Sequence, residues 1–290
     1  MVDSRPDWVV SRQRAWGVPL SIFINKKTGK PLMDKDVNRR IAESFRENGS
    51  DSWFSVESSE YLGDKYDPND WEKVNDILDV WFDSGSTHAF VLENDDNLSS
   101  PANLYLEGSD QHRGWFQSSL LESCGTRGVA PFEQVLTHGF VMDKDGRKMS
   151  KSIGNVILPD DLINQYGADV VRLWVVSSDF TEDLRIGQEI MKANVESYRK
   201  IRNTFRFLLG NLHGFSSKEI VRYEDMPELE RYILHKLKVM DEKIREGYND
   251  YDLKAVFQTL LNFSNLDLSS FYFDIRKDSL YCDSLNSNSR

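Results

Sequence analysis

The sequence predicts a doubly wound (Rossmann-like) α/β domain followed by an α-helical bundle. Two short apolar runs, 103–107 and 135–137, have the length and composition of strands. The first run stops at Gly108 and is followed by a helical pattern, as in a strand–turn–helix unit. In the last third of the chain the apolar residues recur at helical spacing only. We therefore divide the chain into an α/β domain, 1–178, and a helical domain, 179–290.

The first domain opens with strand-like apolar segments at 8–25. Residues 34–48 have the apolar spacing of an amphipathic helix, and residues 49–76 are polar and rich in turn-forming residues. We interpret 34–76 as a surface insertion, after which the chain returns to the domain at 77–82.

Helices follow the second strand run. Pro159 is expected to begin a helix, because proline suits the first helical position and Asp160 and Asp161 favour its positive end. Another helix is predicted at about 169–177.

The second domain has the pattern of a helical bundle. Amphipathic helices are predicted at 190–212, 229–244 and 253–261, joined by short loops. The first of them is expected to close at 210–214, where two glycines occur.

The loop 146–155, GRKMSKSIGN, carries the strongest functional signal. Lys148 and Lys151 flank Met149 and Ser150, and their ammonium groups are compact charges on long, flexible stems. Such groups are suited to neutralising charge that develops on a polyphosphate. A solvated basic turn is the alternative interpretation.

The two predicted strands lead to the same candidate site. Gly108 allows close approach of a sugar or base, and the Asp110 carboxylate can accept hydrogen bonds from ribose hydroxyls. The second strand runs into His138 and Gly139 and then a hairpin at 143–146, which brings the lysine loop to the same sheet edge. A glycine turn followed by an Asp N-cap is the alternative for the first strand end.

The chain is acidic, with a formal net charge of -11. Residues 51–110 hold 15 acidic and 2 basic side chains, so this stretch is expected to be a solvated face turned away from phosphates. Arg199, Arg202 and Arg206 follow helical spacing and form a stripe that suits a nucleic-acid backbone. A solvated helix flank is the alternative.

Composition bounds the class of protein. With 39% hydrophobic and 12% aromatic residues the chain can bury a sizeable core. Cys124 and Cys282 are isolated, so we expect neither a zinc site nor a disulfide. The apolar runs are short and interrupted by charges, and the N-terminal residues do not resemble a signal peptide, so we expect a cytoplasmic protein with no membrane segment.

Four motifs, LDVWFDSGSTH, LEGSDQHRGWF, VLTHGFVMD and KMSKSIGN, occur in this order. In content and spacing they resemble the catalytic domain of class I aminoacyl-tRNA synthetases, and most closely its isoleucine-specific members. The similarity runs from about Trp8, near SRQRAWGVP, to about Asp278. It implies ATP-dependent activation of isoleucine, with Mg²⁺ carried by ATP, and transfer to tRNA(Ile) by an enzyme that is a monomer in its full-length form. The helical domain would then be anticodon-binding, and the surface insertion would correspond to the family's second connective peptide.

The resemblance also assigns roles to residues. Lys148 and Lys151 would be the catalytic residues that stabilise phosphate charge. Asp110 would contact the ribose, and Glu107 or Gln111 would lie nearer the amino group. The residues that would bind ATP or the adenylate are Glu107, Gly108, Asp110, Gln111, His138, Gly139, Val141, Met149 and Ser150.

Trp81 and Trp115 are the candidates for the walls of the amino-acid pocket. Large rigid aromatic faces can contact a branched side chain without presenting unpaired polar groups. Plain core positions are the alternative for both residues.

Some parts that the resemblance implies are not found in the sequence. The family's His-x-Gly-His turn has no counterpart among the histidines at 88, 112, 138, 213 and 235, and no editing domain is present. We therefore expect an internal segment of a larger synthetase, with an incomplete active site and with Met1 not at the native start. A non-catalytic module that binds nucleotide or tRNA, and a valine- or leucine-specific relative, remain alternatives.

Overall fold

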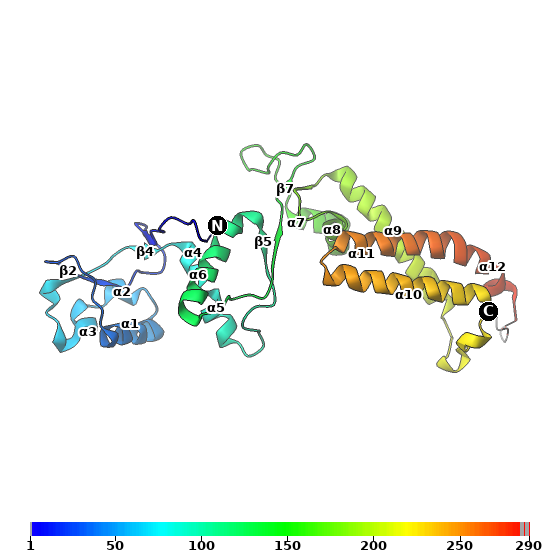
Figure 1. The fold of residues 1–290 in the computed structure, drawn as a ribbon. Helices are drawn as coiled ribbons and strands as arrows, with labels where there is room; N and C mark the ends of the chain where they lie inside the picture. The colour runs from blue at the N-terminus through cyan, green and yellow to red at the C-terminus, as the bar shows by residue number, and fades with distance from the viewer. Residues whose placement is uncertain (1, 285–286, 288–289) are drawn as a thin grey trace. The chain divides into compact units, whose positions relative to one another are not determined.

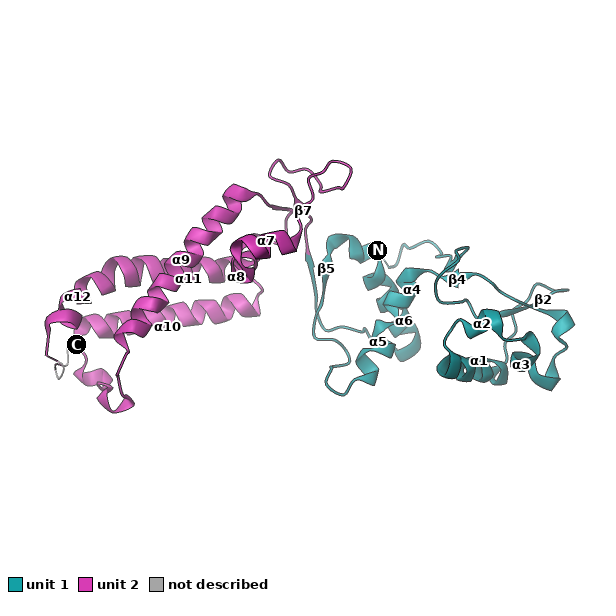
Figure 2. Ribbon diagram, turned by 180° about the vertical axis from the view of Figure 1, so that it is seen from behind, with its two compact units in different colours: residues 1–137 teal, residues 138–290 magenta. Residues whose placement is uncertain are grey.

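The computed structural model describes residues 2–284, 287 and 290, and the chain forms two compact units. Figures 1 and 2 show the elements and the division between Met1–Thr137 and His138–Arg290. The boundary predicted from sequence after residue 178 differs from this division and stays a prediction. At the end of the predicted second domain, residues 285–286 and 288–289 lie outside the described residues.

The first unit combines short strands with short helices. Its elements are β1 (Ser11–Arg12), β2 (Phe23–Asn25), α1 (Lys35–Asn48), α2 (Ser52–Ser55), α3 (Ser58–Leu62), β3 (Trp71–Lys73), β4 (Ile77–Leu78), α4 (Val80–Gly85), α5 (Thr87–Phe90), β5 (Tyr105–Gly108), the 3-10 helix η4 (Ser109–Arg113), α6 (Trp115–Arg127) and β6 (Val135–His138). Shorter 3-10 helices are η1 (Gly63–Lys65), η2 (Pro68–Asp70) and η3 (Leu92–Asn94).

The segment predicted as a surface insertion has its own core. Helix α1 is confirmed, and its N-cap Asp34 accepts hydrogen bonds from the amides of Asp36 and Val37. Residues 49–76, although polar and turn-rich in sequence, contribute to this core, because the rings of Trp53 and Tyr61 stack 5.5 Å apart and both are buried. Their helices, α2 and α3, have only four and five residues, too few to show a helical period. The buried residues of this core are Phe23, Val37, Ile41, Trp53, Tyr61 and Leu62.

The predicted strand–turn–helix unit is confirmed by β5, η4 and α6. Strand β5 lies beside β6 in a two-stranded sheet, and α6 packs against α4. Helix α6 begins after Gly114, which makes no side-chain cap, and Asp110 lies within η4. The alternative interpretation of Asp110 as an N-cap is therefore not what the structure shows.

The second unit is mainly helical. Its elements are β7 (Val141–Met142), α7 (Pro159–Tyr166), α8 (Ala168–Ser177), β8 (Leu184–Arg185), α9 (Gln188–Asn211), the 3-10 helices η5 (Ser217–Glu219) and η6 (Tyr223–Asp225), α10 (Glu228–Asn249), α11 (Leu253–Asn262), the π-helix η7 (Phe263–Tyr272) and α12 (Phe273–Cys282). The helix predicted to begin at Pro159 is confirmed, with both acids in its first turn.

A short strand interrupts the region that was expected to be helical only. Strand β8 pairs in parallel with β7, with Val141 opposite Leu184 and Met142 opposite Arg185. The expectation of helices alone in the domain 179–290 is therefore wrong for Leu184 and Arg185, because a two-residue strand has no period that the sequence can reveal.

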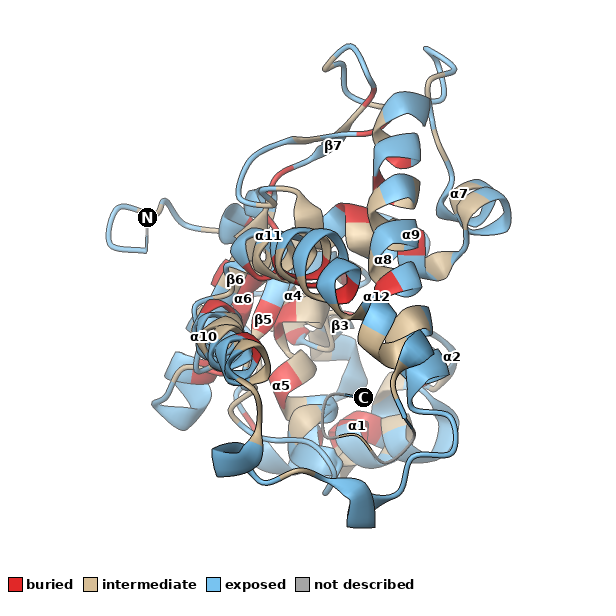
Figure 3. Ribbon diagram, turned by 90° about the vertical axis from the view of Figure 1, so that its right-hand side faces the viewer, coloured by how far each residue is buried: buried red, intermediate tan, exposed pale blue. Residues whose placement is uncertain are grey.

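The bundle contains the three predicted helices and a continuation beyond them. Helices α10 and α11 approach closely at Gly247, where an added Cβ would lie 2.7 Å from a Val256 side-chain carbon. After α11 the chain continues through η7 into α12, which the sequence pattern did not predict. In Figure 3 buried and exposed positions alternate along α9, as expected for an amphipathic helix. Along the described residues, no helix combines the length and apolar character needed to cross a membrane.

Candidate active site

One carboxylate ties together the two ends of the lysine loop. Asp143 is 5% exposed, and its Oδ1 accepts hydrogen bonds from the amides of Asp145 (3.0 Å) and Arg147 (2.9 Å). Its Oδ2 accepts from Nε of Arg147 and from Nδ2 of Asn155, each at 2.9 Å. The Asn155 bond, followed by that of the Arg147 amide, holds the pKa of Asp143 well below its usual range. Asp143 is therefore ionised at neutral pH.

Asn155 organises the far side of the loop. Its Oδ1 accepts from the Ser150 amide at 2.9 Å, and its Nδ2 also donates to the Lys148 carbonyl at 3.3 Å. The Ser150 hydroxyl accepts from the amide of Ile153 at 3.2 Å. Met149 packs against the core formed by α8 and α9. The loop is thus a defined structure held by its own side chains, and neither Asp143 nor Asn155 was singled out from the sequence.

The two signature lysines point their charges outward. Lys148 and Lys151 are exposed, and within the described part of the chain neither forms an ion pair. The Lys148 ammonium lies 5.0 Å from the ring centre of Phe140. By contrast, Lys144 pairs with Asp145 at 2.9 Å. Lys148 and Lys151 are therefore available to an anionic ligand.

A groove of about 750 Å³ lies beside the loop and the start of α9. Its lining includes Asp143, Arg147, Asn155, Ile186 and Gln188. The groove thus adjoins the network that holds the loop.

The backbone before the loop is packed against the segment after α8. A Cβ at Gly139 would lie 2.3 Å from the Glu182 carbonyl oxygen, so only glycine fits. The Gly139 amide donates to the Phe180 carbonyl at 2.9 Å, and Nδ1 of His138 lies 2.8 Å from the Gly139 carbonyl. The side chain of Val141 is exposed. These contacts define the backbone of the segment 138–141, which is predicted to bind ATP or the adenylate.

The predicted adenylate-binding residues of the first unit follow β5. Gly108 is buried, Gln111 is half-buried, and Glu107 and Asp110 are exposed. Among the described residues, neither exposed carboxylate has a protein partner. Oε1 of Gln111 accepts from the Trp115 amide at 3.3 Å. The two acids are therefore free to accept hydrogen bonds from hydroxyl or ammonium groups.

The two candidate pocket tryptophans lie close together in the first unit. A Cβ at Gly114 would lie 3.4 Å from Cε2 of Trp81, so the Trp81 indole lies beside the residue that precedes Trp115. Trp81 is 45% exposed, whereas Trp115 is half-buried against Tyr105, with ring centres 4.8 Å apart. The Trp81 indole is thus accessible to a ligand, whereas Trp115 packs into the aromatic core beside it.

Two acids at the junction of α4 and α6 have raised pKa values. Burial, assisted by the charge of Asp83, raises the pKa of Glu122 to about 7. Burial, followed by the charge of Asp79, also raises the pKa of Asp83. Among the described residues, Oε1 of Glu122 is buried without a hydrogen-bond partner. Glu122 therefore titrates near neutral pH, a property that the sequence pattern did not reveal.

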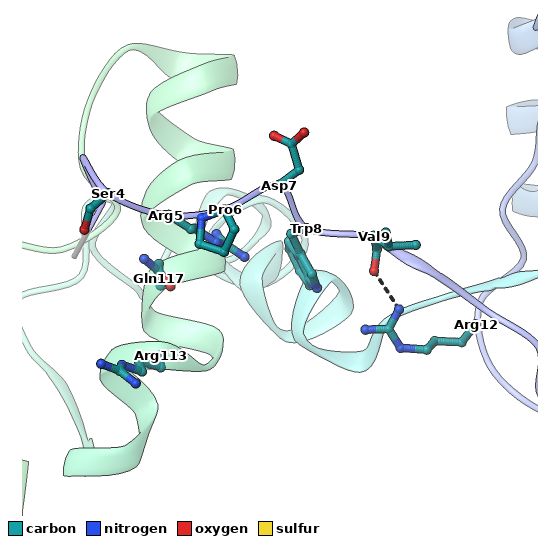
Figure 4. Close-up of a pocket in the computed structure, with 9 residues that line it drawn as sticks. All are labelled: Ser4, Arg5, Pro6, Asp7, Trp8, Val9, Arg12, Arg113 and Gln117. Carbon is teal, nitrogen blue, oxygen red and sulfur yellow. Dashed lines mark hydrogen bonds between the residues drawn. The ribbon is translucent and has the colours of Figure 1, made fainter.

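A cleft of about 870 Å³ lies between the N-terminal segment and α6 (Figure 4). Figure 4 shows Arg113 and Gln117 on the helical side and Ser4 to Val9 on the other. The Arg5 guanidinium lies 4.9 Å from the Trp8 ring centre. Arg12 donates to the Val9 carbonyl at 2.6 Å and forms an ion pair with Asp79. Guanidinium groups beside an indole suit phosphates and stacked bases.

The predicted arginine stripe lies on α9. Arg199, Arg202 and Arg206 are exposed, and Arg199 is partly neutralised by Glu196 at 2.9 Å.

The predicted site residues form two groups, one in each unit. Trp81, Gln111 and Trp115 lie together in the first unit. The lysine loop and its neighbours His138, Gly139 and Val141 lie in the second unit.

The chain matches two protein-family models. Residues 1–187 match tRNA synthetases class I (I, L, M and V), and residues 230–290 match the anticodon-binding domain of tRNA ligase. Isoleucine-tRNA ligase of Pelagibacter ubique is 57% identical over 100% of the chain and 32% of the relative. The enzyme of the same name from Zymomonas mobilis is 58% identical over 98% of the chain and 30% of the relative. The chain thus spans about 30% of the length of these curated relatives.

Solved structures share the fold. An Agrobacterium radiobacter LeuRS–tRNA–LeuAMS complex gives a TM-score of 0.68 at 20% identity, covering 89% of this chain and 35% of that one. Mycobacterium tuberculosis methionyl-tRNA synthetase with methionyl-adenylate gives 0.54 at 17% identity, covering 90% of this chain and 58% of that one. At these identities the likeness establishes the fold alone, and it confirms the predicted fold class.

Proposed function

The chain belongs to the class I tRNA synthetases (I, L, M and V), and from that premise we propose that it carries part of the active site of an isoleucine-tRNA ligase. The observation that carries the proposal is the lysine loop, which is held by Asp143 and Asn155 while Lys148 and Lys151 remain without ion pairs among the described residues. High identity to isoleucine-tRNA ligases over the whole chain supports isoleucine as the amino acid.

In the proposed reaction the carboxylate of isoleucine attacks the α-phosphorus of ATP. A new oxygen–phosphorus bond forms, the bond to the bridging oxygen breaks, and pyrophosphate leaves. Lys148 and Lys151 stabilise the charge that develops on the phosphates. The amino acid is then transferred to a hydroxyl at the 3′ end of tRNA(Ile), and AMP leaves.

Magnesium would be bound mainly through ATP. Among the described residues, no group of three or more His, Cys, Asp or Glu side chains could hold a metal ion. Mg²⁺ commonly keeps several waters and binds substrate phosphates in preference to dedicated protein cages. The contribution of this chain is the pair of lysines, which complement the negative charge of the ATP phosphates that Mg²⁺ does not neutralise.

The contacts proposed for the adenylate and for tRNA follow from single residues and motifs. Glu107, Asp110 and Gln111 would contact the ribose and the amino group, and His138 and Val141 would line the adenine side. For tRNA, the family match at 230–290 supports contact by the bundle. The exposed arginines of α9 and the cleft in Figure 4 add positive charge. A monomer is proposed for the complete enzyme.

We predict that the 290-residue chain alone will not catalyse isoleucine-dependent exchange of pyrophosphate into ATP. The chain corresponds to about 30% of the length of active relatives, and its histidines offer no His-x-Gly-His turn to bind the phosphates from the other side. A chimeric ligase, in which residues 1–290 replace the matching segment of the Pelagibacter ubique enzyme, should catalyse the exchange. Both proteins are assayed with isoleucine, valine and leucine.

The outcomes separate the alternatives. Exchange by the isolated chain would contradict the prediction. A folded chimeric ligase that binds ATP or tRNA without exchange would indicate a non-catalytic module. A chimeric ligase that prefers valine or leucine would indicate a relative with another specificity.

Replacing Trp115 by Leu in the chimeric ligase is expected to erode the preference for isoleucine over valine. The smaller side chain removes apolar contact with the substrate, and one methylene is worth about 1–3 kcal/mol, a magnitude known for this enzyme family. The measurement is the ratio of kcat/KM values for the two amino acids in pyrophosphate exchange, with the KM for ATP expected to change little.

Trp53→Leu is the matched control for this substitution. Trp53 is 0% exposed in the α1–α3 core, so its loss should cost about 2–5 kcal/mol of stability without changing the ratio. If Trp115→Leu behaves like Trp53→Leu, with lower stability and an unchanged ratio, Trp115 is a core residue and the pocket assignment is wrong.

A further inference from the structure

We propose that Ser118 is a positioning residue that sets the spacing of Trp81 and Trp115 and thereby the selectivity for the amino-acid side chain. The inference rests on the proposed function, because it concerns the pocket of that enzyme. The hydroxyl of Ser118 contacts the backbone carbonyl groups of both Trp81 and Trp115.

One hydroxyl reaches both tryptophan-bearing segments. Ser118 is 2% exposed, and its Oγ lies 2.5 Å from the carbonyl oxygen of Trp81 and 3.1 Å from that of Trp115. A bond from a helical serine to a carbonyl of its preceding turn is common. The shorter contact is different, because it crosses from α6 to α4 between residues 37 positions apart. Ser118 therefore ties α4 to the first turn of α6.

Gly85 allows this close approach of α4 and α6. A Cβ at Gly85 would lie 2.8 Å from the Ser118 hydroxyl and 2.6 Å from Oε1 of Glu122. A Cβ at Gly114 would lie 3.4 Å from the Trp81 indole. At Gly85 a side chain would therefore collide with Ser118 and Glu122 of α6, whereas the Gly114–Trp81 distance is an ordinary contact. The short bond from Ser118 thus depends on the absence of a Cβ atom at Gly85.

The two tryptophans differ in how they are supported. Trp115 contacts the rings of Tyr105 and Phe116, each with ring centres 4.8 Å from its own. Trp81 is 45% exposed and makes no ring–ring contact among the described residues. Its position consequently depends on the backbone of α4, to which Ser118 donates. Loss of the hydroxyl should therefore move Trp81 relative to Trp115 more than it disturbs the core around Tyr105.

The test uses the chimeric ligase with Ser118→Ala. We expect the isoleucine-over-valine ratio of kcat/KM to fall about 3- to 10-fold, while the KM for ATP stays within about twofold, because a hydrophobic pocket discriminates through close contact. Ser118→Thr keeps the hydroxyl and should retain a ratio closer to that of the unsubstituted chimeric ligase. If Ser118→Ala is poorly folded, the isoleucine-over-valine ratio of Ser118→Thr still tests the proposal.

Ser123→Ala is the matched control. Ser123 is also 2% exposed on α6, but it donates to the Val129 carbonyl at 2.9 Å, away from both tryptophans. The control should lower the melting temperature by a similar amount and leave the ratio unchanged. An unchanged ratio in Ser118→Ala, or an equal change in Ser123→Ala, would overturn the positioning role. An unsubstituted chimeric ligase that binds ATP but does not activate isoleucine would instead reject the proposed function, and this inference with it.

Discussion

Replacing Lys148 by Ala in the chimeric ligase is expected to lower the rate of isoleucine activation by about 10²–10³-fold, the usual cost of removing one preorganised electrostatic group. The binding constants for isoleucine and ATP should stay within a few-fold. Lys148 is exposed and lacks an ion pair among the described residues, and its ammonium lies 5.0 Å from the Phe140 ring centre, so its charge is available when phosphate charge develops. Single-turnover rates measured beside equilibrium binding separate the two effects.

Lys144→Ala, in the turn that precedes the loop, provides the matched control. Its ammonium is already paired with Asp145 at 2.9 Å, so its loss should change the activation rate little. Equal losses of rate and of ATP binding in Lys148→Ala would show that Lys148 is a ground-state phosphate anchor, contrary to the prediction.

Asp143→Asn is expected to reduce activation by about 10²-fold through displacement of the lysine loop, since small misplacements of catalytic groups carry penalties of this size. The Asp143 carboxylate accepts four hydrogen bonds, two at each oxygen. In the Asp143→Asn variant an NH₂ group replaces one of these oxygens, so the two N–H groups that it bonded lose their acceptor. Faster hydrogen exchange of the amides at 145, 147 and 150 would report the loosened loop directly.

The same network has a defined pH dependence. The folded-state pKa of Asp143 is lowered, chiefly by the Asn155 hydrogen bond, so its stabilising effect is present above the ordinary carboxyl pKa of about 4. The effect is lost as pH falls through the depressed value, and the loop is therefore expected to remain ordered across the neutral range.

Asp145→Asn is the control for Asp143→Asn. It removes an exposed carboxylate from the same turn and should leave hydrogen exchange and activation nearly unchanged. Rapid exchange in both variants would argue against a specific role for Asp143.

The sequence predicted the parts of this molecule that depend on local pattern. Helices α1, α7, α9 and α10 have clear periods or end signals, and the lysines stand out by their spacing. Asp143 and Asn155 were missed because their bond joins residues 12 positions apart and exists only once the loop closes. The core around Trp53 was missed because its helices are shorter than two turns. Trp81 and Trp115 were singled out, but the Ser118 bond between their segments arises from packing of α4 on α6.

The pairing of β7 with β8 connects the lysine loop to the helical bundle through backbone hydrogen bonds. The amide of Leu184 donates to the Phe140 carbonyl and that of Ile186 to the Met142 carbonyl, and α9 begins at Gln188. The backbone that leads into the longest helix of the bundle is therefore bonded to the strand that leads into the loop. We therefore expect a displacement of the start of α9, for example by a bound macromolecule, to reach the loop both through these hydrogen bonds and through Met149, which packs against the core formed by α8 and α9.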